Sequence, residues 1–181
     1  MQGSDQQART RDGTRLAYTL YDHPAPSRRI VLVHSLAMDR SFWRPVAERL
    51  AANASVLIHD CRGHGGSDKP AGPVTVERHA DDLADLLDRL GWKTALVAGA
   101  SMGGCIALAF AIRHPGRVAA LGLVDTTAWY GPDAPKSWEQ RADAALASGL
   151  SSLTDFQVTR WFGDKFRAEH PQVVEDCVDH K

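Results

Sequence analysis

Residues 96–110 read LVAGASMGGCIALAF, and this stretch decides the fold. An apolar run precedes Gly99, small and apolar residues follow Gly103, and one serine, Ser101, stands between them. The Gly-x-Ser-x-Gly spacing lets a sharp strand-to-helix turn hold the serine hydroxyl above a sheet without side-chain clashes. We therefore predict a strand, a tight turn and a helix, with Ser101 as the nucleophile at the turn. A glycine-rich turn with an incidental serine is the alternative.

The same turn predicts one site for binding an oxyanion. A helix that begins directly after Ser101 leaves the backbone N–H of Met102 without an acceptor inside the helix. Such an N–H group can face the negative charge that develops when a serine attacks a carbonyl group.

The composition excludes several classes of partner. The chain has 181 residues, of which 44% are hydrophobic and 24% charged, an ordinary globular mixture. Its formal net charge of −1 gives no electrostatic argument for binding nucleic acid or an anionic membrane surface. Residues 1–7 lack a hydrophobic signal core and no apolar run approaches about 18 residues, so we predict a cytoplasmic protein. The three cysteines are odd in number and widely spaced, so neither a disulfide framework nor a metal site is expected.

The hydrophobic pattern outside this stretch predicts an α/β fold. Residues 14–20 alternate polar and apolar, as in a half-exposed antiparallel edge strand. The apolar runs 30–33, 56–58 and 118–124 indicate buried strands. Alternation of these runs with helical patterns predicts a mostly parallel sheet with crossover helices.

One of these helices carries a row of acidic residues. Apolar residues at helical spacing predict an amphipathic helix over residues 76–90. We interpret its carboxylates as a solvated face rather than a metal site; they belong to Asp81, Asp82, Asp85 and Asp88.

The pattern changes after Asp125. Residues 137–147 and 154–162 indicate short helices, and no further β-branched run follows. We therefore divide the chain into a core, residues 1–128, and a helical lid or cap segment, residues 129–181. Trp138 and Arg141 are three residues apart and share a helix face, which suits a clamp for a substrate carboxylate. Ordinary surface charge is the alternative.

Three motifs together resemble the α/β-hydrolase superfamily. They are residues 34–36 (HSL), residues 60–68 (DCRGHGGSD) and residues 99–104 (GASMGG), and the resemblance spans nearly the whole chain. Residues 35–39, 125–128 and 138–141 are similar to the 3-oxoadipate enol-lactonase branch.

The resemblance implies an α/β-hydrolase fold and a serine hydrolase of a small lactone or ester in aromatic-compound breakdown. It implies an acyl-enzyme intermediate and neither a metal nor an organic cofactor. It also places the second oxyanion donor at the backbone N–H of Leu36, beside that of Met102. His34, next to this loop, is expected to serve loop hydrogen bonding rather than proton transfer.

The catalytic triad is incomplete in this sequence. In this fold the acid and then the histidine follow the serine, which leaves His114, His170 and His180 as candidate bases. His114 lies about 20 Å along the helix from Ser101 and is a helix-end residue, while neither of the other two follows a core strand. Asp125 directly follows a strand and is either the acid or a turn-capping residue.

The resembled family would continue with two further strands that carry the acid and the histidine. We therefore expect the chain to hold the N-terminal part of the fold and the start of the lid, to be C-terminally truncated and to show little turnover. A noncatalytic small-ligand binding module of the same fold is the alternative, and esterase, perhydrolase or carbon–carbon hydrolase chemistry stays open. The strand at residues 118–124 would have an unpaired edge, which favours self-association or pairing with a C-terminal fragment.

Overall fold

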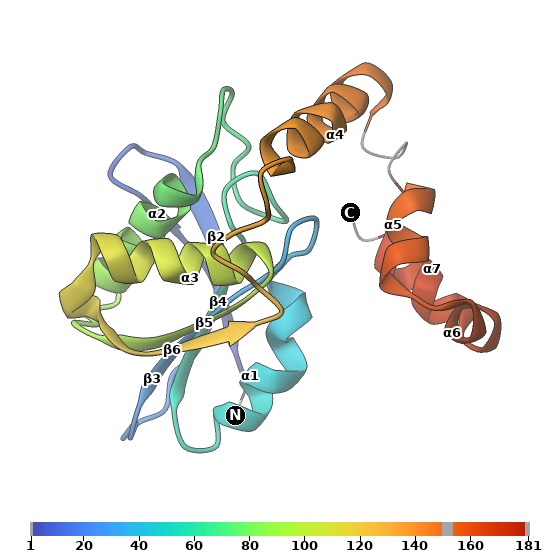
Figure 1. The fold of residues 1–181 in the computed structure, drawn as a ribbon. Helices are drawn as coiled ribbons and strands as arrows, with labels where there is room; N and C mark the ends of the chain where they lie inside the picture. Colours follow the sequence, from blue (N-terminus) through green and yellow to red (C-terminus); the bar gives the residue numbers. More distant parts are fainter. Residues whose placement is uncertain (1, 150–153, 180–181) are drawn as a thin grey trace. The chain divides into compact units, whose positions relative to one another are not determined.

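The computed structural model describes residues 2–149 and 154–179, and it divides the chain into two compact units. The first unit is Met1–Ala128 and the second is Trp129–Lys181. Figure 1 shows a sheet with helices on both faces in the first unit and helices alone in the second. None of the helices that the structure describes is long and apolar enough to cross a membrane.

The first unit is built on one mixed sheet. Within the described residues it has six strands in the order β1-β2-β4-β3-β5-β6. Pairing is parallel from β4 through β3 and β5 to β6, and antiparallel at β1/β2 and β2/β4. The predicted α/β-hydrolase architecture, mostly parallel with crossover helices, is confirmed. The strands are β1 (Ser4–Arg9), β2 (Arg15–Tyr21), β3 (Arg29–Val33), β4 (Ser55–His59), β5 (Ala95–Ala100) and β6 (Val118–Val124).

The N-terminal edge of the sheet differs from the prediction. Residues 14–20 were expected to form the edge strand, but β2 pairs on both sides and is buried along most of its length. The edge is β1, which the sequence pattern did not indicate because Ala8 is its one buried residue. Backbone pairing with β2, rather than burial of an apolar face, holds this strand in place.

Helices cover the two faces of the sheet separately. The helices α2 (Val76–Arg89) and α3 (Met102–Arg113) pack on one face through residues such as Leu83 and Phe110. The short helices η1 (Arg40–Trp43) and α1 (Arg44–Leu50) pack on the other. The layers can be followed in Figure 1. A short turn of helix, η2 (Pro115–Arg117), leads into β6.

The prediction that residues 118–124 form a buried strand is wrong about the burial. The strand is present as β6, but Leu121, Leu123 and Val124 are 39%, 48% and 47% exposed. Among the described residues β6 is the last strand of the sheet and pairs only with β5. An apolar pattern indicates a strand, whereas burial depends on neighbours that lie elsewhere in the sequence.

The acidic row on α2 is not a solvated face. Asp82 is buried and accepts a hydrogen bond of 2.6 Å from Nε of Arg62. Asp81 pairs with Arg113, Asp85 with Arg11, and Asp88 with Arg117. The solvated description fits only Asp88, whose side chain is 58% exposed. These aspartates therefore join α2 to neighbouring elements through ion pairs.

The second unit is helical throughout its described elements. The predicted helices are confirmed as α4 (Ala134–Ser148) and α5 (Thr154–Trp161). Two further helices, α6 (Asp164–Glu169) and α7 (Pro171–Asp179), pack on each other. The rings of Phe162 and Phe166 stack with their centroids 5.4 Å apart.

Candidate active site

Ser101 occupies a strained turn between β5 and α3. Its φ of 50° and ψ of −114° lie in a region that L-residues rarely adopt. The backbone is fixed on both sides, since its N–H donates to the carbonyl oxygen of Val124 at 2.9 Å. Its carbonyl oxygen accepts hydrogen bonds from Gly104 N–H and from the Thr126 hydroxyl. The predicted strand, turn and helix are confirmed, while the role of Ser101 as a nucleophile stays a prediction.

Three glycines make this turn possible. A Cβ atom on Gly99 would lie 2.1 Å from the carbonyl group of Gly103, and one on Gly104 would lie 2.4 Å from the Thr126 side chain. A Cβ on Gly103 would lie 2.2 Å from the carbonyl oxygen of Val33. The backbones of α3 and of the end of β3 therefore meet with no room for a methyl group.

The two predicted oxyanion donors both belong to this edge of the sheet. Met102 is the first residue of α3, where an N–H has no acceptor inside the helix. β3 and β5 are parallel neighbours with Val33 opposite Gly99, so Leu36 and Ser101 both follow the carboxyl ends of adjacent strands. Leu36 lies in a turn closed by a 3.2 Å hydrogen bond from Met38 N–H to the Ser35 carbonyl oxygen.

His34 is a structural residue of this loop. The ring is completely buried, its Nε2 accepts the Cys61 N–H at 3.0 Å, and its Nδ1 lies 2.8 Å from the Ser35 carbonyl oxygen. These partners assign the neutral tautomer with the proton on Nδ1. Burial lowers the pKa of His34 to about 4. The prediction that His34 serves loop hydrogen bonding is confirmed.

Sequence reasoning missed a buried polar network beneath this loop. The Asp60 carboxylate is fully buried and accepts hydrogen bonds from the N–H groups of Arg40 and Gly66. Arg62, in the glycine-rich loop after β4, makes a separate ion pair with buried Asp82 on α2. An aspartate that directly follows a buried strand and precedes a glycine-rich loop was the available signal.

Asp125 lies next to the candidate nucleophile. It directly follows Val124, whose carbonyl oxygen accepts the Ser101 N–H, and its φ of 45° is left-handed. The residue is exposed. Its backbone fits a turn residue, and its role as the triad acid stays a prediction.

None of the described histidines after Ser101 is hydrogen-bonded to it. Nε2 of His114 lies 3.0 Å from Asp81 at the end of α3, which confirms that it is a helix-end residue. His170 follows α6 in the second unit and packs on the Phe166 ring. His180 lies outside the described residues. A base for Ser101 is therefore not identified within residues 2–149 and 154–179.

Trp138 and Arg141 meet on α4, as their spacing predicted. The guanidinium carbon of Arg141 lies 4.7 Å from the centre of the Trp138 ring. The ring of Tyr130 also contacts Trp138, edge to face, at 6.3 Å between centroids. Nε of Arg141 has no hydrogen-bond partner among the described residues. The pair is thus a cation–π contact on one helix face.

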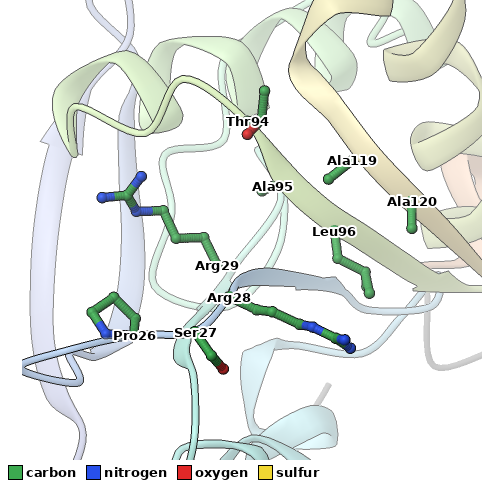
Figure 2. Close-up of a pocket in the computed structure, with 9 residues that line it drawn as sticks. All are labelled: Pro26, Ser27, Arg28, Arg29, Thr94, Ala95, Leu96, Ala119 and Ala120. Atoms are coloured by element: carbon green, nitrogen blue, oxygen red, sulfur yellow. The ribbon is translucent and has the colours of Figure 1, made fainter.

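One pocket of the first unit lies away from Ser101. Figure 2 shows this pocket of about 660 Å³ between the starts of β3, β5 and β6, with Arg28 and Leu96 among its lining residues. Ligands of open α/β sheets bind at the carboxyl ends of the strands, so this pocket is not part of the candidate active site. Within the described ranges, no group of three or more His, Cys, Asp or Glu side chains is arranged to hold a metal ion.

Known proteins are similar to this chain in sequence and in fold. Residues 28–157 match the family described as the alpha/beta hydrolase fold. The 3-oxoadipate enol-lactonase 1 of Acinetobacter baylyi is 32% identical over 155 residues, which cover 86% of this chain and 57% of that protein. The chain thus spans little more than half the length of the curated relatives that it matches first.

Solved structures agree with this relationship. The enol-lactonase from Burkholderia xenovorans LB400 superposes with a TM-score of 0.88 at 35% identity, covering 96% of this chain and 66% of that one. A hydrolase from Pseudomonas aeruginosa PA01 superposes with a TM-score of 0.89 at 32% identity, covering 99% of this chain and 67% of that one.

Proposed function

We propose that this chain, which belongs to the alpha/beta hydrolase fold family, supplies the nucleophile and oxyanion donors of a serine hydrolase of small esters or lactones. The observation that carries the proposal is the left-handed backbone of Ser101. The turn around it packs so tightly that only glycine, which has no Cβ atom, fits at the neighbouring positions. A strained residue at the carboxyl edge of a parallel sheet marks a functional position rather than a stabilising one.

The reaction follows from the placement of these groups. Ser101 Oγ attacks the carbonyl carbon, its proton passes to a base, and the carbonyl electron pair moves onto the oxygen. The N–H groups of Met102 and Leu36 stabilise this oxyanion. Collapse of the tetrahedral intermediate expels the alkoxide, which takes the proton from the base, and leaves an acyl-enzyme; in a lactone the resulting hydroxyl stays attached to the acyl group. Water then gives a proton to the base and attacks the acyl-enzyme ester, and that proton returns to Ser101 Oγ as the acid leaves.

The substrate class that we favour is a small lactone bearing a carboxylate. The names of two relatives, both enol-lactonases, support a lactone. Arg141 supports the carboxylate, because the Trp138 ring holds its guanidinium while its Nε has no partner among the described residues. A role in aromatic-compound breakdown and a cytoplasmic location belong to the same proposal.

The nucleophile is tested by labelling the full-length protein with a fluorophosphonate probe. We expect Ser101→Ala to abolish labelling, because the probe forms its bond with the serine oxygen. Cys105→Ala is the matched control, since this thiol lies one helical turn further along α3, and it should label normally. Equal labelling of wild type and Ser101→Ala would refute the proposal. Absence of labelling in both would favour the noncatalytic binding module.

The substrate carboxylate is tested by kinetics on a lactone acid and its methyl ester. Arg141→Ala should raise KM for the acid at least about tenfold and leave the methyl ester nearly unchanged, because only the acid loses an ion pair. Lys136→Ala removes another cation from α4 and should change neither substrate. Equal losses of Arg141→Ala on both substrates would exclude the clamp.

A further inference from the structure

The loop that carries Leu36 is held at both ends by two consecutive residues. At the start of the loop, the Cys61 N–H donates to Nε2 of His34 at 3.0 Å. At its end, the Arg40 N–H donates to Oδ1 of Asp60 at 2.7 Å, and the Arg40 guanidinium pairs with Oδ2. Asp60 and Cys61 come directly after β4, so the sheet anchors both of these contacts.

The Asp60 carboxylate is enclosed and fully engaged. Its side chain is 0% exposed, and Oδ2 also accepts the Gly66 N–H at 2.8 Å. A Cβ on Gly65 would lie 2.4 Å from Oδ2, so the glycine loop closes directly over the carboxylate. A buried charge is tolerated when it is paired and hydrogen-bonded, and such a group resists displacement.

Between these two ends the loop makes a single tight turn. Ala37 has a left-handed φ of 58°, and Met38 N–H closes the turn onto the Ser35 carbonyl oxygen. Nδ1 of His34 contacts the same carbonyl oxygen at 2.8 Å. The turn that contains Leu36 is therefore held between the fixed positions of His34 and Arg40.

The same loop touches the helix that carries Met102. Gly103 packs so closely on the carbonyl oxygens of Val33 and His34 that its Cβ would lie 2.2 and 2.7 Å from them. The indole N–H of Trp43 donates to the Val33 carbonyl oxygen at 2.9 Å and fixes the same point from the opposite side. A shift of the loop would therefore change the placement of Leu36 relative to Ser101 and Met102.

We propose that Asp60 is a positioning residue, which through Arg40 and the adjoining Cys61–His34 contact holds the Leu36 N–H in place as an oxyanion donor. This inference rests on the proposed serine hydrolase function. Asp60 touches neither substrate nor nucleophile. Its effect is on the rates of acylation and deacylation, since both pass through an oxyanion and a displaced donor weakens transition-state binding more than ground-state binding.

The test compares Asp60→Asn with Asp82→Asn in the full-length protein. Both changes neutralise a buried carboxylate that pairs with an arginine, but Asp82 pairs with Arg62 and has no contact with the 34–40 loop. For hydrolysis of p-nitrophenyl acetate we expect Asp60→Asn to lower kcat about tenfold or more with KM within about twofold. Asp82→Asn should leave both constants within about twofold while losing a comparable amount of stability.

Hydrogen exchange supplies a readout that does not need activity. Amides of residues 34–40 should exchange faster in Asp60→Asn than in Asp82→Asn, because only the first loosens the loop. If Asp60→Asn does not fold, Arg40→Gln removes the guanidinium, keeps the backbone hydrogen bond and should act in the same direction.

The outcomes separate the two proposals. Equal kcat values for the Asp60 and Asp82 variants, with Ser101 still labelled by fluorophosphonate, would overturn the positioning role and leave the hydrolase proposal intact. Failure of the wild type to label at Ser101 would overturn both. Faster exchange of the 34–40 amides together with a fall in kcat in Asp60→Asn but not in Asp82→Asn would establish Asp60 as a positioning residue.

Discussion

Acid is expected to destabilise the first unit through three buried histidines. His34, His59 and His79 are at most 6% exposed, and burial lowers their pKa values to about 4, 3 and 4. An unfolded histidine has a pKa of about 6.5, so below that pH these three histidines are protonated in the unfolded chain but remain neutral in the folded chain. The stability contributed by the neutral rings is complete above about pH 6.5 and is lost as the pH falls toward 4.

The size of the loss follows from the difference in proton binding. Between about pH 7 and about pH 5 each such histidine costs about 2 kcal/mol of unfolding free energy, or about 6 kcal/mol for the three. Domains of this kind are stable by about 5–15 kcal/mol in total, so the loss is a large share. Urea unfolding at these two pH values, followed by far-ultraviolet circular dichroism, measures it directly.

A single substitution isolates one of these contributions. Nδ1 of His59 has no hydrogen-bond partner among the described residues, so His59→Leu removes a titrating ring without breaking a hydrogen bond at that atom. The loss between the two pH values should fall by about 2 kcal/mol. His170→Gln, at an exposed position of the second unit, should change nothing. An unchanged pH dependence in His59→Leu would refute the reasoning.

Three further changes test other parts of the structure. Gly103→Ala should destabilise the protein by about 3 kcal/mol or more in urea unfolding, because its methyl group would meet backbone carbonyls, whereas Gly116→Ala meets nothing within 4 Å and should be nearly neutral. Trp43→Phe should cost about 1–3 kcal/mol in the same assay through the lost buried hydrogen bond. The exposed apolar residues of β6 should make the 181-residue chain associate in size-exclusion chromatography with light scattering, and Leu121→Lys/Leu123→Lys should return it to a monomer. A monodisperse wild-type monomer would contradict the last prediction.

The parts of the fold that local pattern encodes were predicted well. The strands β3, β4 and β5 each contain a continuous apolar run, and burial on both faces favours that composition. β1 was missed because a polar strand held by backbone pairing leaves no hydrophobic period. The exposure of β6 was missed for the converse reason, since an apolar strand looks the same in sequence whether or not another element covers it.

The acidic residues of α2 show the same limit for charges. Their helical spacing is readable, but the arginines that pair with them come from three separate stretches of the chain, around residues 11, 62 and 113–117. A carboxylate on a helix face is solvated or buried according to partners that only the tertiary structure brings to it. Asp82, at 2% exposure, was therefore the least predictable of the four.

At the candidate site, sequence and structure contribute different information. The glycines around Ser101 are readable because strand-to-helix turns demand small residues at fixed spacing, and the clash distances show why. The contact between Arg40 and Asp60 joins loops twenty residues apart, and no local rule predicts it. The loop of Leu36 nevertheless contacts both the turn at Ser101, through Gly103, and the buried carboxylate of Asp60, through Arg40. The turn at Ser101 and the loop of Leu36 thus meet at Gly103, and we expect a change that loosens this loop to impair the candidate nucleophile and the proposed oxyanion donor together.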